Sequence, residues 1–367
     1  MTKVRIVGGG LTGVLAAFEA HRLGCRDIEI HERLEQLGGD DLPDRPQGLE
    51  LRDEQIDFGP RGGPLRRMLE WRGVAFDEVD GDQAGAFGPG QTLPPVAPTG
   101  GSLADWIRAH PPKVAEALGR YCQWRLSAWL DEMDESAAAP LGLDGRMIAP
   151  PTPPRGGVAA MFGACLHALR DLGVKVRTQD LVSPWRVLQA RAPDETVVWA
   201  ADPTPLFKAC DLPTPKQLYV SSPTYFFRLD HEAAAPIHIR NLAAEGVVAE
   251  LRGYESRGES VLAVECVAEA PDALLRREIC RLAVEARGTG LAVGEQLGVS
   301  LRPRRGYRSA DAAHQLKRLR LHLAETAGEA IVTDAWEPFA PADRFAALRV
   351  GLAAALARHA PAIEAAA

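Results

Sequence analysis

The most constraining feature of the sequence is a run of glycines between a short apolar segment and a helical one. Residues 3–7, KVRIV, predict a β-strand, and residues 11–24, LTGVLAAFEAHRLG, carry apolar side chains at the helical period and end in glycine. Residues 27–32, DIEIHE, alternate as a second strand. The segment therefore predicts a strand–helix–strand unit, with the glycines of VGGGLTG at the turn from strand to helix.

Each glycine of this G-x-G-x-x-G pattern has a separate predicted role. Gly8 permits a tight turn, Gly10 lets the backbone approach a pyrophosphate, and Gly13 lets the helix pack closely on the strand. The helix N-terminus, which begins at Leu11 and Thr12, offers backbone N–H groups and the positive end of the helix dipole to phosphates. The turn is therefore a candidate phosphate site.

An acidic residue follows at the matching distance. Glu32 ends the second strand 19 residues after Gly13, and a carboxylate at that position accepts hydrogen bonds from ribose hydroxyls. A purely structural glycine turn is the alternative, but strand, helix, strand and acid together favour a dinucleotide site. Glu32 alone does not separate NAD from FAD.

Composition excludes several other classes of protein. The net charge is −7 with acids and bases interleaved, which argues against nucleic-acid binding; the arginine-dense residues 300–309 are expected to form a solvated loop. The six cysteines and nine histidines lack metal-binding spacing, so no metal is expected. A strand follows Met1 without a signal peptide, and Arg349 and Arg358 interrupt the last apolar stretch, so a cytoplasmic protein without membrane contact is expected.

Two segments after Glu32 carry a resemblance to a known family. Residues 32–41, ERLEQLGGDD, place Gly38-Gly39 after the acid, and residues 49–63, LELRDEQIDFGPRGG, end an alternating strand in a D-x-G-P sequence. The chain here resembles the glutathione-reductase-type FAD proteins. More narrowly, it resembles the superfamily of amine oxidases, protoporphyrinogen oxidases and UDP-galactopyranose mutases, in which a D-x-G-P segment passes beside the flavin.

The order of later segments is similar to that family along nearly the whole chain. The resemblance implies an α/β fold, with a Rossmann-like FAD-binding domain (βαβ, mostly parallel sheet) and an inserted mixed α+β substrate domain. The FAD-binding domain would comprise residues 1–75, 151–212 and 301–367. The substrate domain would comprise a helical insert, 76–150, and an antiparallel sheet, 213–300.

The resemblance also implies which residues bind the cofactor, FAD. The N-terminus of the last helix, near residues 342–345, would aim backbone N–H groups at the flavin. The full predicted set is Gly8, Gly10, Leu11, Thr12, Gly13, Glu32, Arg33, Gly39, Gly59, Pro60, Arg61, Val182, Asp334, Trp336, Arg344 and Phe345.

Two departures from the family pattern leave a degenerate, non-catalytic nucleotide-binding protein open. Asp40 and Asp41 stand where the family often has Arg or Lys followed by Ser or Thr. Two acids facing a pyrophosphate repel it unless they point to solvent. Near the C-terminus, Thr333-Asp334 replaces the Gly-Asp common in the family.

Four residues are candidates for contact with the substrate or the flavin ring: Arg61, Tyr219, Arg240 and Tyr254. Arg61 follows the D-x-G-P sequence, and a fold-stabilising arginine is its alternative role. Arg240 and Tyr254 lie on predicted strands that the family turns toward the substrate, and a surface ion pair is the alternative for Arg240.

Aromatic residues supply further, weaker candidates. Tyr219, Tyr225 and Phe227 alternate in residues 218–230, which predicts that they share one face of one strand. Three tryptophans of the helical insert are expected to be mostly core residues: Trp106, Trp124 and Trp129.

The resemblance predicts an FAD-dependent oxidoreductase that oxidises a C–N or C–C bond of a small-molecule substrate by hydride transfer to the flavin. A flavin enzyme needs few catalytic side chains because the cofactor carries the redox step. The first alternative is a non-redox mutase that resembles UDP-galactopyranose mutase. Such a mutase would bind a nucleotide diphosphate with arginines, for which Arg155, Arg240 and Arg305 are candidates.

Overall fold

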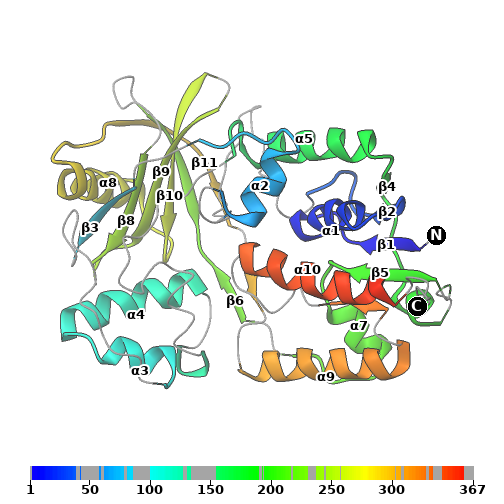
Figure 1. Cartoon of the computed structure of the whole chain (residues 1–367). Coiled ribbons are helices and arrows are strands. Elements are labelled where there is room, and N and C mark those ends of the chain that lie inside the picture. The colour runs from blue at the N-terminus through cyan, green and yellow to red at the C-terminus, as the bar shows by residue number, and fades with distance from the viewer. Residues whose placement is uncertain are drawn as a thin grey trace.

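The computed structural model describes two main sheets that lie side by side (Figure 1). The described residues are 2–38, 42, 58, 62–77, 81–85, 100–126, 130–133, 154–189, 192, 194–215, 218–229, 237–243, 245–256, 258–301, 303–306, 310–327, 330–333 and 341–358. None of the helices within these ranges is both long and apolar enough to cross a bilayer.

The first domain is built on a five-stranded sheet in which every neighbouring pair is parallel. The strand order is β13-β5-β1-β2-β4, and β1 occupies the centre, with Lys3 opposite Asp27 on one side and Glu195 on the other. Its strands come from three separate parts of the sequence. They are β1 (Lys3–Val7), β2 (Asp27–His31), β4 (Lys175–Arg177), β5 (Glu195–Trp199) and β13 (Ile331–Val332).

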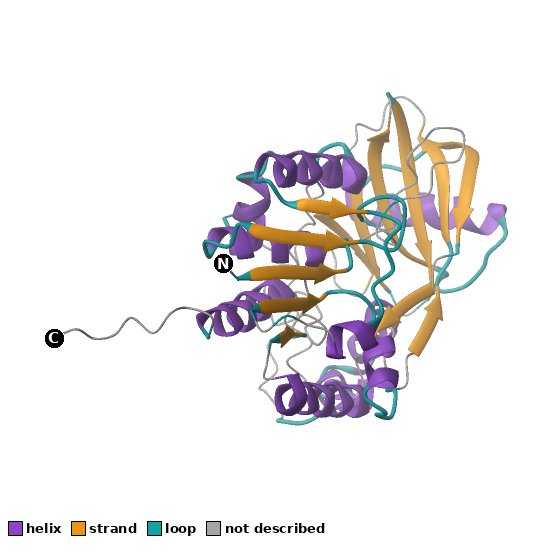
Figure 2. Ribbon diagram, turned by 90° about the vertical axis from the view of Figure 1, so that its right-hand side faces the viewer, coloured by secondary structure: helices purple, strands orange, loops and turns teal. Residues whose placement is uncertain are grey.

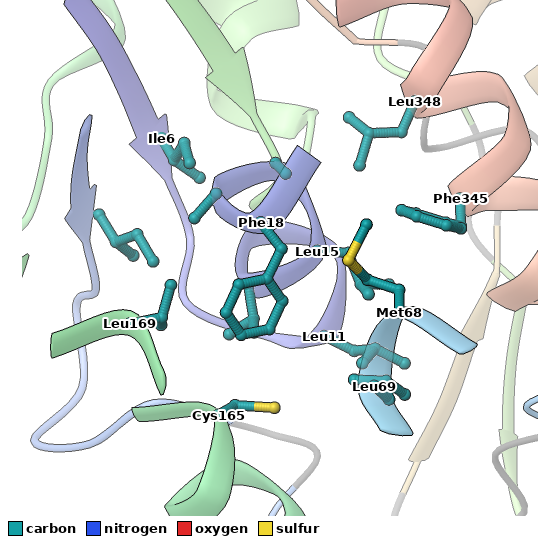
Figure 3. Packing of buried hydrophobic residues seen from close by; sticks show 14 of the residues in the cluster. Ile6, Leu11, Leu15, Phe18, Met68, Leu69, Cys165, Leu169, Phe345 and Leu348 are labelled. Carbon is teal, nitrogen blue, oxygen red and sulfur yellow. The ribbon is translucent and has the colours of Figure 1, made fainter. Parts of the chain in front are cut away.

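Helices cover both faces of this sheet (Figure 2). On one face, α1 (Leu11–Arg22) packs against α2 (Pro64–Glu70), α5 (Gly157–Asp171) and α10 (Pro341–Ala357). Figure 3 shows how Leu15 and Phe18 of α1 lie among side chains of these three helices. On the other face lie α6 (Pro184–Gln189), α7 (Thr204–Ala209) and α9 (Ala310–Ala327).

The second domain is a six-stranded sheet of order β11-β7-β10-β9-β8-β3, antiparallel except for the pair β3–β8. The helix α8 (Asp272–Arg287) covers one face of this sheet, and apolar side chains of the helix and the sheet form a common core. The strands are β3 (Gly81–Gly85), β7 (Thr224–Leu229), β8 (Ile237–Leu242), β9 (Val248–Ser256), β10 (Glu259–Cys266) and β11 (Val293–Ser300).

The predicted helical insert packs at one end of this sheet. Trp106 and Trp124 are buried in a cluster that also includes Leu242, which confirms their interpretation as core residues, whereas Trp129 lies outside the described residues. Ser102 caps the first helix through a reciprocal capping box with Asp105. The insert consists of α3 (Leu103–Arg108), α4 (Pro112–Leu126) and the short 3₁₀ helix η3 (Leu130–Glu132).

The single strand expected over residues 218–230 is two strands, so one prediction was wrong. β6 (Leu218–Ser221) pairs with β12 (Pro303–Gly306) in a separate two-stranded sheet. Ser222 and Pro223 lie between the end of β6 and the start of β7. Proline has no N–H group for a strand ladder, which explains the break. Tyr225 and Phe227 share a face and pack toward α8, but Tyr219 belongs to the other sheet.

Candidate functional site

The carboxyl ends of the five parallel strands meet at one edge of the first sheet. Gly8 follows β1, Glu32 follows β2, Ala200 follows β5 and Thr333 follows β13. In open parallel sheets, ligands bind outside this edge, where the strand order reverses. Gly8 and Glu32, two of the predicted nucleotide residues, therefore lie at the edge where this topology places a ligand.

Gly8 and Gly13 are held at positions where a side chain does not fit. Gly8 has a φ of 103°, and a Cβ atom there would lie 2.8 Å from the backbone nitrogen of Ala201. A Cβ atom on Gly13 would lie 1.9 Å from the carbonyl oxygen of Gly8. The tight turn and the close helix packing predicted for these two glycines are both present.

The middle glycine, Gly9, has a role that the sequence pattern did not indicate. Its N–H donates a hydrogen bond to Oε2 of Glu32 over 2.6 Å. A Cβ atom on Gly9 would lie 2.6 Å from Cδ2 of Leu37 and 3.0 Å from the same carboxylate oxygen. The additional glycine between Gly8 and Gly10 was the available sequence signal for this contact.

The carboxylate of Glu32 is buried and fixed by backbone donors. Oε2 accepts from Gly9, and Oε1 accepts from the N–H of Leu34 over 2.7 Å. The backbone of Glu32 is held as well, since its N–H donates to Arg177 and its carbonyl accepts from Asp180. Each carboxylate oxygen has two lone pairs, so both oxygens keep the capacity to accept a ribose hydroxyl.

The N-terminus of α1 suits an anion. Gly10 is the N-cap in an extended conformation, and no side chain among the described residues caps the helix there. The first turn also carries no acidic residue. The backbone N–H groups of a first helical turn and the positive end of the helix dipole favour a phosphate at such a position. The glycine turn, the buried acid and this helix end together fit a dinucleotide.

A network of ion pairs centred on Glu29 connects β1, β2 and β4. Glu29 lies 2.9 Å from Nζ of Lys3, 3.5 Å from Nζ of Lys175 and 3.3 Å from the Arg177 guanidinium. Burial would raise the pKa of Glu29, but hydrogen bonds from Lys3 and Arg177 and their charges outweigh it and lower the pKa to about 2. The carboxylate is therefore ionised throughout the ordinary pH range.

The other described cofactor candidates have varied surroundings. Arg33 is exposed next to Glu32, and Val182 packs beside the core formed with α7 and α9. Arg344 is half-buried on α10, whereas Phe345 is fully buried in the core against α1 (Figure 3). Outside the described residues lie Gly39, Asp40, Asp41, Gly59, Pro60, Arg61, Asp334 and Trp336.

Two of the four substrate candidates share one face of the second sheet. In the register of β8 and β9, the backbone of Arg240 is opposite that of Glu250, and Tyr254 lies four residues further along β9. Both side chains are therefore on the face of the sheet that points away from α8. Tyr219 is in the two-stranded sheet, and Arg61 lies outside the described residues.

The face shared by Arg240 and Tyr254 carries charged residues that the sequence analysis missed. We define the polar face as His238 and Arg240 of β8, Glu250 and Arg252 of β9, and Glu265 of β10. His238 Nε2 contacts Glu250, and the Arg252 guanidinium contacts Glu265. Burial lowers the pKa of His238 despite the opposing charge of Glu250. The available signal was polar residues at alternate positions in the otherwise apolar segments IHIRN and ELRGY.

Comparisons with known proteins identify the fold. No protein-family model and no curated protein sequence matches the chain. Its structure is similar to reduced UDP-galactopyranose mutase, with 12% identity, a TM-score of 0.65, and 98% of this chain and 96% of that chain covered. It is also similar to a putrescine oxidase variant, with 14% identity, a TM-score of 0.61, and 97% and 99% covered.

A third similar structure is a fatty acid isomerase from P. acnes, with 12% identity, a TM-score of 0.53, and 96% and 97% of the two chains covered. The predicted fold is thus confirmed: a Rossmann-like domain with a parallel sheet, and a second domain with a largely antiparallel sheet. No group of three or more His, Cys, Asp or Glu side chains in the described ranges is placed to hold a metal ion.

Proposed function

We propose that the protein is an FAD-dependent oxidoreductase that oxidises a C–N or C–C bond of a small molecule. The observation that carries the proposal is the glycine turn, closed by the Gly9–Glu32 hydrogen bond, beside the N-terminus of α1, whose N-cap is Gly10. The likeness in fold to an oxidase and a mutase supports the same class, and the family that the sequence resembles uses FAD.

The residues present would divide the work of holding the cofactor. The backbone N–H groups at the start of α1, from Leu11 and Thr12, would face the pyrophosphate, and Gly10 lets the backbone approach it. Glu32 would accept the ribose hydroxyls with oxygens already oriented by Gly9 and Leu34. When bound, FAD supplies the redox chemistry by accepting a hydride from the substrate.

The second sheet would supply the substrate side of the site. It stands between α8 and the parallel-sheet domain (Figure 1), so the face opposite α8, with Arg240 and Tyr254, is turned toward that domain. Polar side chains on such a surface orient a substrate and exclude wrongly charged ones.

The oxidoreductase is favoured over the mutase by the position of one arginine. Arg155 lies 2.9 Å from Asp77 in a surface ion pair with 70% of its side chain exposed. It is therefore already neutralised and solvated, which removes one of the three arginines considered for a diphosphate. Arg305 is on the separate strand β12.

The first experiment is the visible spectrum of the purified protein, followed by denaturation and identification of the released cofactor by chromatography. We expect flavin bands and FAD in the supernatant, and we expect a substrate to bleach the bands under anaerobic conditions without added reductant. A protein that requires prior reduction and shows no net redox is a mutase. A colourless protein that takes up no FAD contradicts the proposal and indicates the degenerate alternative.

A variant of Glu32 tests the site directly. In Glu32→Ala the ribose acceptor is lost, and we expect FAD affinity to fall by about 10- to 100-fold, as for the loss of a hydrogen bond to a charged group. Glu35→Ala, an exposed acid in the same loop, is the control and should bind FAD like the wild type. Equal affinity in the two variants contradicts the assigned role of Glu32.

A further inference from the structure

The two faces of the second sheet differ in a way that the fold does not require. The face against α8 is apolar, with Phe227, Ile239 and Leu262 fully buried among residues of the helix. The opposite, polar face carries ionisable side chains at directly opposed positions of three strands, β8, β9 and β10. Charges are rarely buried without a partner because leaving water is costly. Each member of this face therefore needs an explanation.

Four of the five members of the polar face form pairs. His238 contacts Glu250, and Arg252 contacts Glu265. The side chains of His238, Glu250 and Glu265 are almost completely buried. These contacts engage both carboxylates and Arg252 within the sheet, and Glu250 keeps its negative charge because burial lowers the pKa of His238.

Arg240 is the fifth member, and it has no such partner. Its side chain is half-buried, its Nε atom is buried without a hydrogen-bond acceptor, and no described residue forms an ion pair with it. Glu250, directly opposite on β9, is engaged by His238 instead. The guanidinium of Arg240 is thus a cation whose Nε donor has no acceptor among the described residues, on the sheet face that points away from α8.

The surroundings of Arg240 limit what it can bind. A guanidinium matches the two oxygens of a carboxylate or the oxygens of a phosphate. Because Glu250 is the cross-strand neighbour, a doubly charged phosphate is disfavoured relative to a single negative charge. On the same face, Tyr254 packs on an apolar cluster of Phe226, Val261 and Ala263, which suits an apolar body attached to the charged group.

We propose that Arg240 is the binding residue for the carboxylate of the substrate, and that the protein acts on small organic acids with an apolar portion. The role as a substrate residue rests on the proposed oxidoreductase function. The binding of a carboxylate does not rest on it, and it can be measured with and without FAD.

The test uses acetate, benzoate and phenylacetate as probes, with phenylacetamide as the uncharged counterpart of the last. Binding to the full chain is measured by calorimetry and by thermal shift, both before and after incubation with FAD. We expect the acids to bind the wild type, and phenylacetate to bind at least tenfold more tightly than phenylacetamide. In Arg240→Gln the affinity for phenylacetate should fall by about 10- to 100-fold.

Two further variants separate charge from folding. Arg240→Lys keeps the charge without the fork of donors and should recover part of the lost affinity. Arg228→Gln, an arginine of β7 that pairs with Glu295 over 2.9 Å, removes a charge from the same sheet and should bind phenylacetate like the wild type. Far-ultraviolet circular dichroism of all three variants checks the fold.

The possible outcomes are distinct. Acids that fail to bind the wild type, equal affinity for the acid and the amide, or unchanged affinity in folded Arg240→Gln each overturn the proposal. If Arg240→Gln is unfolded, Arg240→Lys becomes the test. An affinity of Arg240→Lys for phenylacetate equal to that of the wild type would then overturn the proposal. Arg240-dependent binding in a protein that takes up no FAD would support the carboxylate site and refute the oxidoreductase.

Discussion

The substitution Gly13→Ala tests the geometry of the nucleotide turn most directly. A Cβ atom at residue 13 would lie 1.9 Å from the carbonyl oxygen of Gly8, whereas carbon and oxygen atoms in close contact are about 3.3 Å apart or more. The N-terminus of α1 would therefore have to move away from the turn by more than about 1 Å. The neighbour is backbone, so no side-chain rotation relieves the contact.

The expected cost follows from this displacement. Overpacking of a well-packed interior typically costs about 1–3 kcal/mol, and we expect the free energy of unfolding to fall by that amount in urea titrations. The same movement takes the N–H groups of Leu11 and Thr12 away from the pyrophosphate. We therefore expect FAD affinity, measured by quenching of flavin fluorescence, to fall at least tenfold.

The matched control is Gly163→Ala in the exposed part of α5. A Cβ atom there meets no other atom within 4 Å, and replacing an exposed helical glycine by alanine stabilises by about 0.5–1 kcal/mol. If Gly13→Ala is as stable as the wild type and binds FAD equally well, the close contact between Gly8 and Gly13 is not a property of the protein, and the argument for the turn fails.

Three further predictions concern stability. The pKa of Glu29, about 2 in the folded chain against an ordinary 4.5, makes a contribution that is complete above about pH 5 and lost as the pH falls toward 2; 2.5 units correspond to about 3 kcal/mol. Acid titration of unfolding should show this dependence, and Glu29→Gln should reduce it. Phe18→Ala empties a fully buried position and should lower the free energy of unfolding by about 3–5 kcal/mol, whereas Val350→Ala, at an exposed position, should change it by less than about 0.5 kcal/mol. Arg155→Gln breaks an exposed ion pair and should cost less than about 1 kcal/mol in the same urea titrations; a larger loss would contradict its placement at the surface.

Much of the fold was predictable because its signals are local. The turn after β1 needs Gly8 for its backbone angle, and the helical period that begins at Leu11 is visible without knowledge of the rest of the chain. The strands that carry Arg240 and Tyr254 were expected from the family resemblance, and they are present as β8 and β9. Treating β6 and β7 as one strand was an error that Ser222-Pro223 could have prevented, since a proline within a run of strand residues argues against one continuous strand.

The site shows where local signals end. The sequence by itself determined the strand–helix–strand unit, the glycines of its turn and the acid at Glu32, because spacing along about 30 residues fixes all of them. Only the tertiary structure decided that Gly9 orients this acid, and that no described residue forms an ion pair with Arg240 while its neighbours pair with one another. The reason is physical: which charges neutralise one another depends on the register of neighbouring strands and on burial, and neither is encoded by the residues of one strand alone.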